Sequence, residues 1–114
     1  MSQIFVVGDI HGGLKALHEV LLKAKIQPQD TLIFLGDYVD GWSDSARLID
    51  YLIDLSKKIN CIFIRGNHDE LFLGWLKDNE ENQMWQFHGG ESTIKAYENI
   101  DSATKSNHIE FLES

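Results

Sequence analysis

The sequence is poor in cysteine and in proline, with one of each in 114 residues. Because Cys61 has no partner, an internal disulfide is excluded, and its place in an apolar run is typical of a small buried side chain. A basic segment followed by an apolar stretch, the mark of a secretory signal, is missing from the N-terminus. No apolar run is long enough to cross a bilayer. We therefore expect a cytoplasmic protein with no membrane partner.

Positive charge is also scarce. Ten Lys and Arg stand against 18 Asp and Glu, giving a formal net charge of -8. This balance argues against non-specific nucleic-acid binding, which relies on an excess of cationic side chains. The composition, 43% hydrophobic and 25% charged, is that of an ordinary globular domain. A phosphate substrate remains compatible with it, because bound cations invert the local charge of an acidic site.

Three polar stretches, each directly after an apolar run, are the most informative feature. The apolar runs cover residues 4–7, 32–35 and 62–64 and are predicted to be β-strands. The polar stretches are Gly8-Asp9-Ile10-His11-Gly12, Gly36-Asp37-Tyr38-Val39-Asp40 and Gly66-Asn67-His68-Asp69.

Helical periodicity separates the strands. Residues 14–24 carry leucine at spacings of three and four. Ser43 or Asp44 can cap a second helix, which carries Leu48, Leu52 and Leu55 and has Lys57 and Lys58 in its last turn, so the first half has a βαβαβ pattern. The nearly continuous apolar strands favour a parallel sheet covered by helices on both faces, an α/β sandwich. In the second half we expect helices at 70–77 and 93–98, a weakly structured segment at 101–107, and another helix from 108.

The carboxyl ends of parallel strands are where open α/β sheets bind ligands. Asp9, His11, Asp37, Asn67 and His68 would meet at that edge. Carboxylate, imidazole and amide groups are ligands for Mn, Fe and Zn. Two such metals, about 3.5–4 Å apart, can hold a phosphate and generate hydroxide near neutral pH, while an imidazole protonates the leaving group. The sequence thus predicts part of a two-metal phosphoesterase site.

The same three stretches resemble the sequence blocks of the calcineurin-like metallophosphoesterases. The similarity is greatest to the branch of bacterial serine/threonine phosphatases and diadenosine tetraphosphatase-like enzymes. A later run, Trp85…His88-Gly89-Gly90…Thr93-Ile94…Tyr97, is similar to that branch's Trp…Asn-Gly-Gly…Thr-Leu…Tyr stretch. The resemblance covers the chain from about Ile4 to its last residue.

The resemblance implies a role for each site residue. Asp9 and His11 would bind the first of two divalent ions, Mn in the first place and Fe or Zn as alternatives. Asp37 would bridge the two ions and Asn67 would bind the second. His68 would be the general acid or bind the substrate phosphate, with Asp40 orienting it. Arg65 would lie near the phosphate. These seven positions are all present.

Two departures from the family pattern stand out. The family usually continues its second block with Asp-Arg-Gly, whereas this chain has Asp40-Gly41-Trp42 and so lacks an arginine that clamps phosphate. Trp42 could stack on an aromatic substrate or simply pack. The family domain also continues for about as many residues again. That second half brings two further histidines, on Val-His-Ala-Gly-like and Gly-His-Thr-like blocks, and both blocks are missing here.

We therefore interpret residues 1–114 as the N-terminal half of a metallophosphoesterase domain. The favoured function is a phosphatase acting on a phosphorylated protein, nucleotide or small molecule, with a diadenosine tetraphosphatase-type hydrolase as an alternative. The other alternative is a catalytically incomplete module that binds metal or a partner, and a half-domain would expose sheet surface through which it self-associates. A dinucleotide-binding unit is disfavoured, because Gly8-Asp9-Ile10-His11-Gly12-Gly13 does not fit G-x-G-x-x-G.

Overall fold

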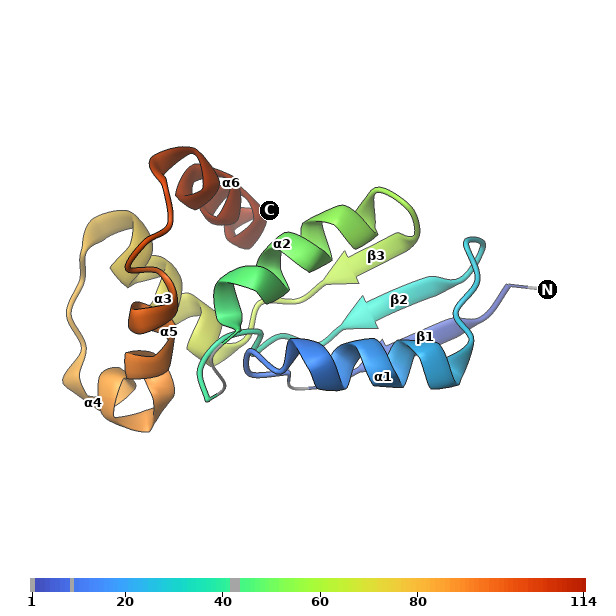
Figure 1. The fold of residues 1–114 in the computed structure, drawn as a ribbon, viewed down its shortest axis with the longest axis horizontal. Coiled ribbons are helices and arrows are strands. Elements are labelled where there is room, and N and C mark those ends of the chain that lie inside the picture. Colours follow the sequence, from blue (N-terminus) through green and yellow to red (C-terminus); the bar gives the residue numbers. More distant parts are fainter. Residues whose placement is uncertain (1, 9, 42–43) are drawn as a thin grey trace.

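A three-stranded parallel sheet forms the centre of the N-terminal part (Figure 1). The computed structural model describes residues 2–8, 10–41 and 44–114. The strands are β1 (Ile4–Val7), β2 (Thr31–Phe34) and β3 (Asn60–Phe63), in the order β1-β2-β3 with β2 in the middle. The predicted βαβαβ unit is therefore confirmed.

Helices α1 (Leu14–Ala24) and α2 (Ser45–Ser56) lie side by side on one face of this sheet (Figure 1). Both crossovers advance in the same direction across the sheet, so the right-handed rule for parallel connections places both helices on the same face. Their apolar stripes close the core against alternate strand residues. The fully buried members of this core include Leu32, Phe34, Leu48, Ile49 and Leu52.

The opposite face of the sheet is exposed in the described part of the chain. Ile4 and Val6 of β1 are 71% and 61% exposed, and Ile62 and Ile64 at β3 are 48% and 47% exposed. The expectation of helices on both faces is wrong for these residues. The apolar character of the strands indicates a face suited to burial, but the two helices available between the strands cover only one side.

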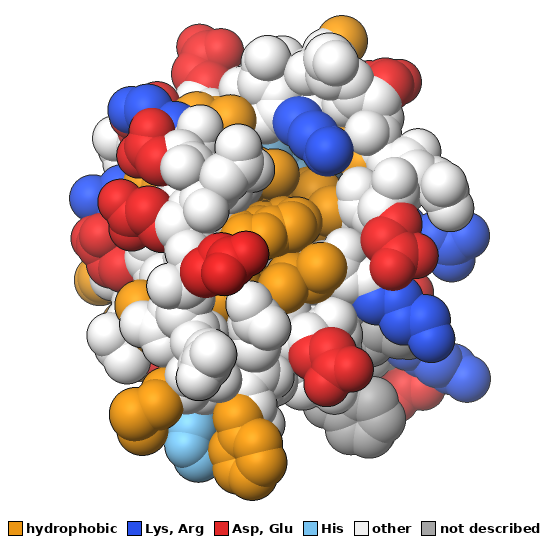
Figure 2. All heavy atoms as spheres, turned by 90° about the vertical axis from the view of Figure 1, so that its left-hand side faces the viewer, with side chains coloured by type: hydrophobic (Ala, Val, Ile, Leu, Met, Phe, Trp, Pro, Cys, Tyr) orange, Lys and Arg blue, Asp and Glu red, His pale blue; other side chains and the backbone are white. Residues whose placement is uncertain are grey.

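The second half is a group of short helices at the end of the molecule where the strands point. They are α3 (Asn67–Asp78), α4 (Gln83–Trp85), the π-helical turn η1 (Gln86–Gly90), α5 (Glu91–Ala96) and α6 (Ser102–Glu113). Figure 2 faces this end and shows hydrophobic side chains in a hollow with a polar and charged rim. None of the helices in the described residues is long and apolar enough to cross a membrane.

The start of α6 differs from the expectation of a weakly structured segment at 101–107. Asp101 caps this helix, and its carboxylate accepts a hydrogen bond from the Thr104 backbone N–H at 2.7 Å. Burial of His108 then fixes the helix to the core. His108 Nδ1 lies 2.7 Å from the Tyr97 hydroxyl, and Nε2 lies 2.7 Å from the Asp50 carboxylate on α2. Burial raises the pKa of Tyr97, so its hydroxyl keeps its proton.

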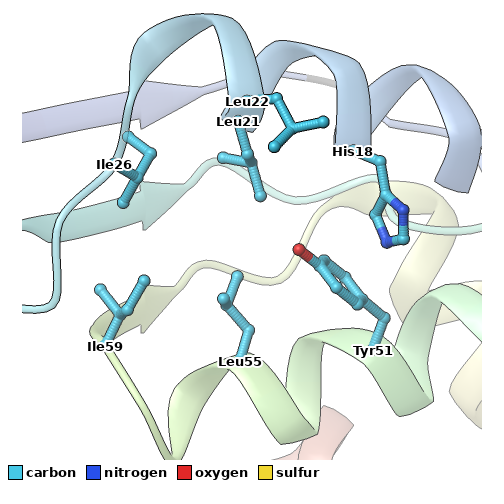
Figure 3. A pocket seen from close by; sticks show the side chains of 7 residues that line it. All are labelled: His18, Leu21, Leu22, Ile26, Tyr51, Leu55 and Ile59. Atoms are coloured by element: carbon cyan, nitrogen blue, oxygen red, sulfur yellow. The ribbon is translucent and has the colours of Figure 1, made fainter.

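A groove of about 310 Å³ runs between α1 and α2 (Figure 3). His18 and Tyr51 close one end of it, with ring centroids 4.4 Å apart. Ile26 and Ile59, at the other end, come just before β2 and β3. The groove therefore extends toward the amino ends of the strands, away from the polar loops that follow them.

Candidate functional site

The loop after β1 is bonded directly to the loop after β2. The backbone N–H groups of Ile10 and His11 both donate to the Asp37 carbonyl, at 3.2 and 2.9 Å. Gly12 N–H donates to the Tyr38 carbonyl at 2.6 Å. These bonds bring the first two polar stretches together at the carboxyl edge of the sheet, as the sequence predicts.

Asp69 joins the second loop to the third. Its side chain is fully buried and accepts three backbone N–H bonds, from Asp37 at 2.6 Å, Tyr38 at 2.8 Å and Gly66 at 2.9 Å. Burial raises the pKa of Asp69 to about 6, while the three donors act in the opposite direction. From the sequence, Asp69 reads as an acidic residue in the first turn of a helix. The structure adds a second role, since it holds the Asp37 and Asn67 loops in register.

Asp37 and the start of α3 approach each other closely. His68 N–H donates to Asp37 Oδ1 at 3.1 Å. A Cβ atom on Gly66 would lie 2.5 Å from the Asp37 backbone nitrogen, so only glycine permits this approach. Asn67, the first residue of α3, lies between Gly66 and His68, and both of these residues contact Asp37. The backbone of Asn67 is therefore close to Asp37.

Asp40 and His68 form the pair that the sequence predicts. His68 Nδ1 lies 2.8 Å from Asp40 Oδ2. Asp40 is 1% exposed, and its carboxylate also accepts bonds from Trp85 Nε1, at 2.6 Å, and from the Thr93 hydroxyl. The Thr93 hydroxyl in turn accepts the Asp40 N–H at 3.0 Å. Three donors fix this carboxylate, and the carboxylate fixes the imidazole.

The sequence marks Trp85 and Thr93 only through the similarity of their run to the family stretch. Trp85 is buried, with 2% of its surface exposed. The run that contains both residues, similar to the family's Trp…Gly-Gly…Thr stretch, is the sequence signal that marks them. Their contact with Asp40 crosses more than 40 residues of chain and so depends on the tertiary fold.

His11 and His68 face each other at this edge. Their ring centroids are 5.1 Å apart and the rings are nearly perpendicular, at 80°. His11 Nδ1 lies 2.9 Å from the Val39 carbonyl. A carbonyl only accepts, so Nδ1 carries the proton in this contact.

Three site residues other than glycine have left-handed backbone conformations. The φ angles are 49° at His11, 53° at Asp37 and 73° at Asp40. Such conformations cost energy for residues with a Cβ, and they cluster where a functional geometry requires them. A turn of the backbone, and not a helix or strand, therefore sets the direction of each of the three side chains.

Arg65 has two partners away from the histidines. Its Nε lies 2.7 Å from the Glu70 carboxylate, and Nη1 donates to the Leu112 carbonyl of α6 at 2.8 Å. The guanidinium thus ties the end of β3 to α3 and α6. The structure shows this structural role for Arg65. Its proximity to a phosphate stays a prediction.

The donor set at the edge fits a divalent metal in its chemistry. His11, Asp37 and Asn67 offer imidazole, carboxylate and amide groups from adjacent loops. Asp9, Trp42 and Ser43, named from the sequence, lie outside the described residues. Within the described part of the chain, no group of three or more His, Cys, Asp or Glu side chains is placed to hold a metal ion.

Comparison with known proteins identifies the family. The family model for the calcineurin-like phosphoesterases matches residues 2–112, so the chain belongs to that family. It is 29% identical over 116 aligned residues to an asymmetrical bis(5'-nucleosyl)-tetraphosphatase of Oceanobacillus iheyensis, covering 94% of this chain and 45% of that protein. It is 30% identical over 89 residues to serine/threonine-protein phosphatase 1 of Salmonella typhimurium, covering 77% of this chain and 39% of that protein.

Solved structures agree on the fold. A metallophosphoesterase from Sphaerobacter thermophilus superposes with a TM-score of 0.64 at 24% identity, covering 96% of this chain and 39% of that chain. A protein described as a putative diadenosine tetraphosphatase gives 0.63 at 22% identity, covering 93% and 45%. The chain thus spans less than half the length of these relatives, and it is a phosphoesterase-family α/β unit.

Proposed function

We propose that this chain carries one half of a two-metal phosphoesterase site. In this proposal Asp9 and His11 bind the first ion, Asp37 bridges the two, and Asn67 binds the second, with Mn preferred over Fe or Zn. The divalent ions would supply a Lewis acid and a hydroxide near neutral pH. Family membership and the bonded loops around Asp37 support this assignment.

The observation that carries the proposal is the Asp40–His68 pair. The His68 side chain is 29% exposed while its carboxylate partner is buried, so one ring edge is anchored and part of the ring reaches solvent. With Nδ1–H bonded to Asp40, Nε2 is the atom that would deliver a proton to the leaving oxygen of a phosphate ester. To bind a phosphate, the Arg65 guanidinium would release the Glu70 carboxylate and pair with the phosphate in its place.

The substrate of the whole protein would be a phosphoprotein, a nucleotide or a small phosphoester. Relatives include both a bis(5'-nucleosyl)-tetraphosphatase and a serine/threonine-protein phosphatase, and this similarity supports both classes. The proposal includes a serine/threonine phosphatase-like activity and a cytoplasmic location.

The test is hydrolysis of p-nitrophenyl phosphate with manganese, with metal content measured on each sample. It compares this chain, a longer chain that adds a second half of the family domain, and Asp37→Asn in both. We expect turnover in the longer chain and its loss in Asp37→Asn, while Asp78→Asn, on the far end of α3, retains it. Turnover that survives Asp37→Asn would contradict the bridging role.

His68→Ala tests the general-acid role separately. Because p-nitrophenolate leaves without a proton, we expect a small loss on p-nitrophenyl phosphate and a loss of about 10²–10⁴-fold on an alkyl phosphate. Equal losses on both substrates would instead indicate that His68 binds the phosphate.

A second candidate function is that of an incomplete module that associates through the sheet. The exposed side chains of Ile4 and Val6 on β1 and of Ile62 on β3 favour it, since they lie on the same face of the sheet, on the two strands that flank β2. We propose that two copies of this chain pair through that face.

A further inference from the structure

The run from Trp85 to Thr93 is a stretch of the sequence to which the proposed metal site gives no role. Both of its ends reach the same carboxylate. Trp85 Nε1–H donates to Asp40 Oδ2 at 2.6 Å, and the Thr93 hydroxyl donates to Asp40 Oδ1. Asp40 Oδ2 is also the atom that lies 2.8 Å from His68 Nδ1. Trp85 and His68 therefore share one oxygen atom, so the indole N–H bonds to the acceptor that orients the imidazole.

A bend at Gly89 lets both ends of the run meet at Asp40. In a straight α-helix eight residues rise about 12 Å, which would separate Trp85 from Thr93 along the axis. The backbone instead leaves the helical conformation at His88 and Gly89, and φ at Gly89 is 118°. A Cβ atom at Gly89 would lie 3.1 Å from Asp40 Cβ, so glycine provides both the bend and the close approach.

The position of the Trp85 ring is fixed by its surroundings. Its backbone N–H donates to Asn82 Oδ1 at 2.9 Å. A Cβ atom on Gly90 would lie 2.5 Å from the ring atoms Cδ2 and Cε2, so the Gly90 backbone packs directly against the indole. The Trp75 ring is a further neighbour, at a centroid distance of 6.1 Å. Because the ring is fixed, its Nε1–H sets where Asp40 Oδ2 lies.

Asp40 depends on such support. Its φ of 73° is a left-handed conformation that costs energy for a residue with a Cβ, and its side chain is 1% exposed. Thr93 alone would anchor only Oδ1 and leave the carboxylate free to turn about that bond. With Trp85 on Oδ2, each oxygen has an anchor and the plane of the group is fixed. An imidazole bonded to Oδ2 keeps its orientation while that plane is fixed.

We propose that residues 85–93 form a positioning unit for the Asp40–His68 pair, in which Trp85 and Thr93 together fix the plane of the Asp40 carboxylate. Trp85 is a positioning residue, since it acts on the imidazole through Asp40. The proposal rests on the phosphoesterase function proposed above, and it names the residues that keep His68 oriented for proton transfer.

The experiment measures by NMR how fast the His68 Nδ1–H proton of this chain exchanges with water, at fixed pH and with chelator present. His68→Gln identifies the signal. We expect Trp85→Phe, which keeps an aromatic ring but removes the N–H, to speed this exchange by about 10-fold or more. Trp75→Phe makes the same change in the neighbouring ring and is the matched control, which should leave the exchange rate unchanged.

A core amide separates positioning from loss of stability. The Leu52 N–H lies in α2 and its residue is fully buried, so its exchange reports global unfolding. A variant that is merely destabilised would speed the exchange of both protons alike, whereas we expect Trp85→Phe to speed His68 more than Leu52. Thr93→Ser keeps the hydroxyl and should retain the slow exchange at His68 that Thr93→Val loses.

The proposal is overturned if His68 exchange in Trp85→Phe is unchanged, slower, or faster only in step with Leu52. A His68 Nδ1–H that is unprotected in the unaltered chain would also overturn it. Because the assay needs neither metal nor turnover, its failure is distinguishable from failure of the phosphoesterase function.

Discussion

Replacing Thr93 with valine removes a single hydroxyl group from the centre of the network that holds Asp40. Thr93 is fully buried, and its hydroxyl both donates to the Asp40 carboxylate and accepts the Asp40 backbone N–H at 3.0 Å. Valine has nearly the same shape, so packing is preserved while both hydrogen bonds are lost. The change therefore isolates the contribution of the network from that of the core.

The expected cost follows from these two bonds. Loss of a hydrogen bond to a carboxylate costs about 1.5–3 kcal/mol, and a buried N–H without an acceptor costs about 1–3 kcal/mol. The sum, about 2.5–6 kcal/mol, is a large fraction of the roughly 5–15 kcal/mol that stabilises a typical domain. At about 4 °C per kcal/mol for a chain of this length, Tm should fall by about 10–24 °C.

The assay is urea unfolding followed by circular dichroism, with thermal unfolding as a second measure. Thr31→Val is the matched control, because it makes the same chemical change on β2, where the Thr31 hydroxyl accepts one exposed bond from Asn60. We expect that control to change stability by less than about 0.5 kcal/mol. The reasoning is refuted if Thr93→Val costs less than about 1 kcal/mol or no more than the control.

Two other predictions concern the packing of α6 and the pairing of two copies of the chain. Tyr97→Phe removes the hydroxyl that bonds to buried His108, so we expect it to lower the free energy of unfolding in urea by about 1–3 kcal/mol. Tyr51→Phe, whose ring lies at the α1–α2 groove, should change that free energy little. Equal effects would show that the Tyr97–His108 bond contributes nothing. Val6→Lys places a charge on the exposed sheet face, so we expect it to turn a dimer into a monomer in size-exclusion chromatography. Leu22→Lys, at the α1–α2 groove, should not have this effect. A wild-type chain that elutes as a monomer would refute the pairing.

Local pattern was enough to predict most of the architecture. The apolar runs and helical spacings of the first half place β1, β2, β3, α1 and α2 correctly, because both periodicities follow from backbone geometry and are visible in short windows. The prediction was wrong for α6, where residues 101–107 are polar. That segment is helical because Asp101 caps it and because His108 is bonded to Tyr97 and Asp50, partners distant in sequence.

The same division applies to the site. The order of the three polar stretches after three strands determines that Asp37, Asn67 and His68 gather at one edge, since parallel strands present their carboxyl ends together. Only the tertiary structure decided how they are held. Asp69 accepts N–H groups from two loops, and Asp40 accepts from Trp85 and Thr93 as well as His68. The residue types in a motif determine which hydrogen bonds its side chains can make. The partners in those bonds come from chain segments that meet only on folding.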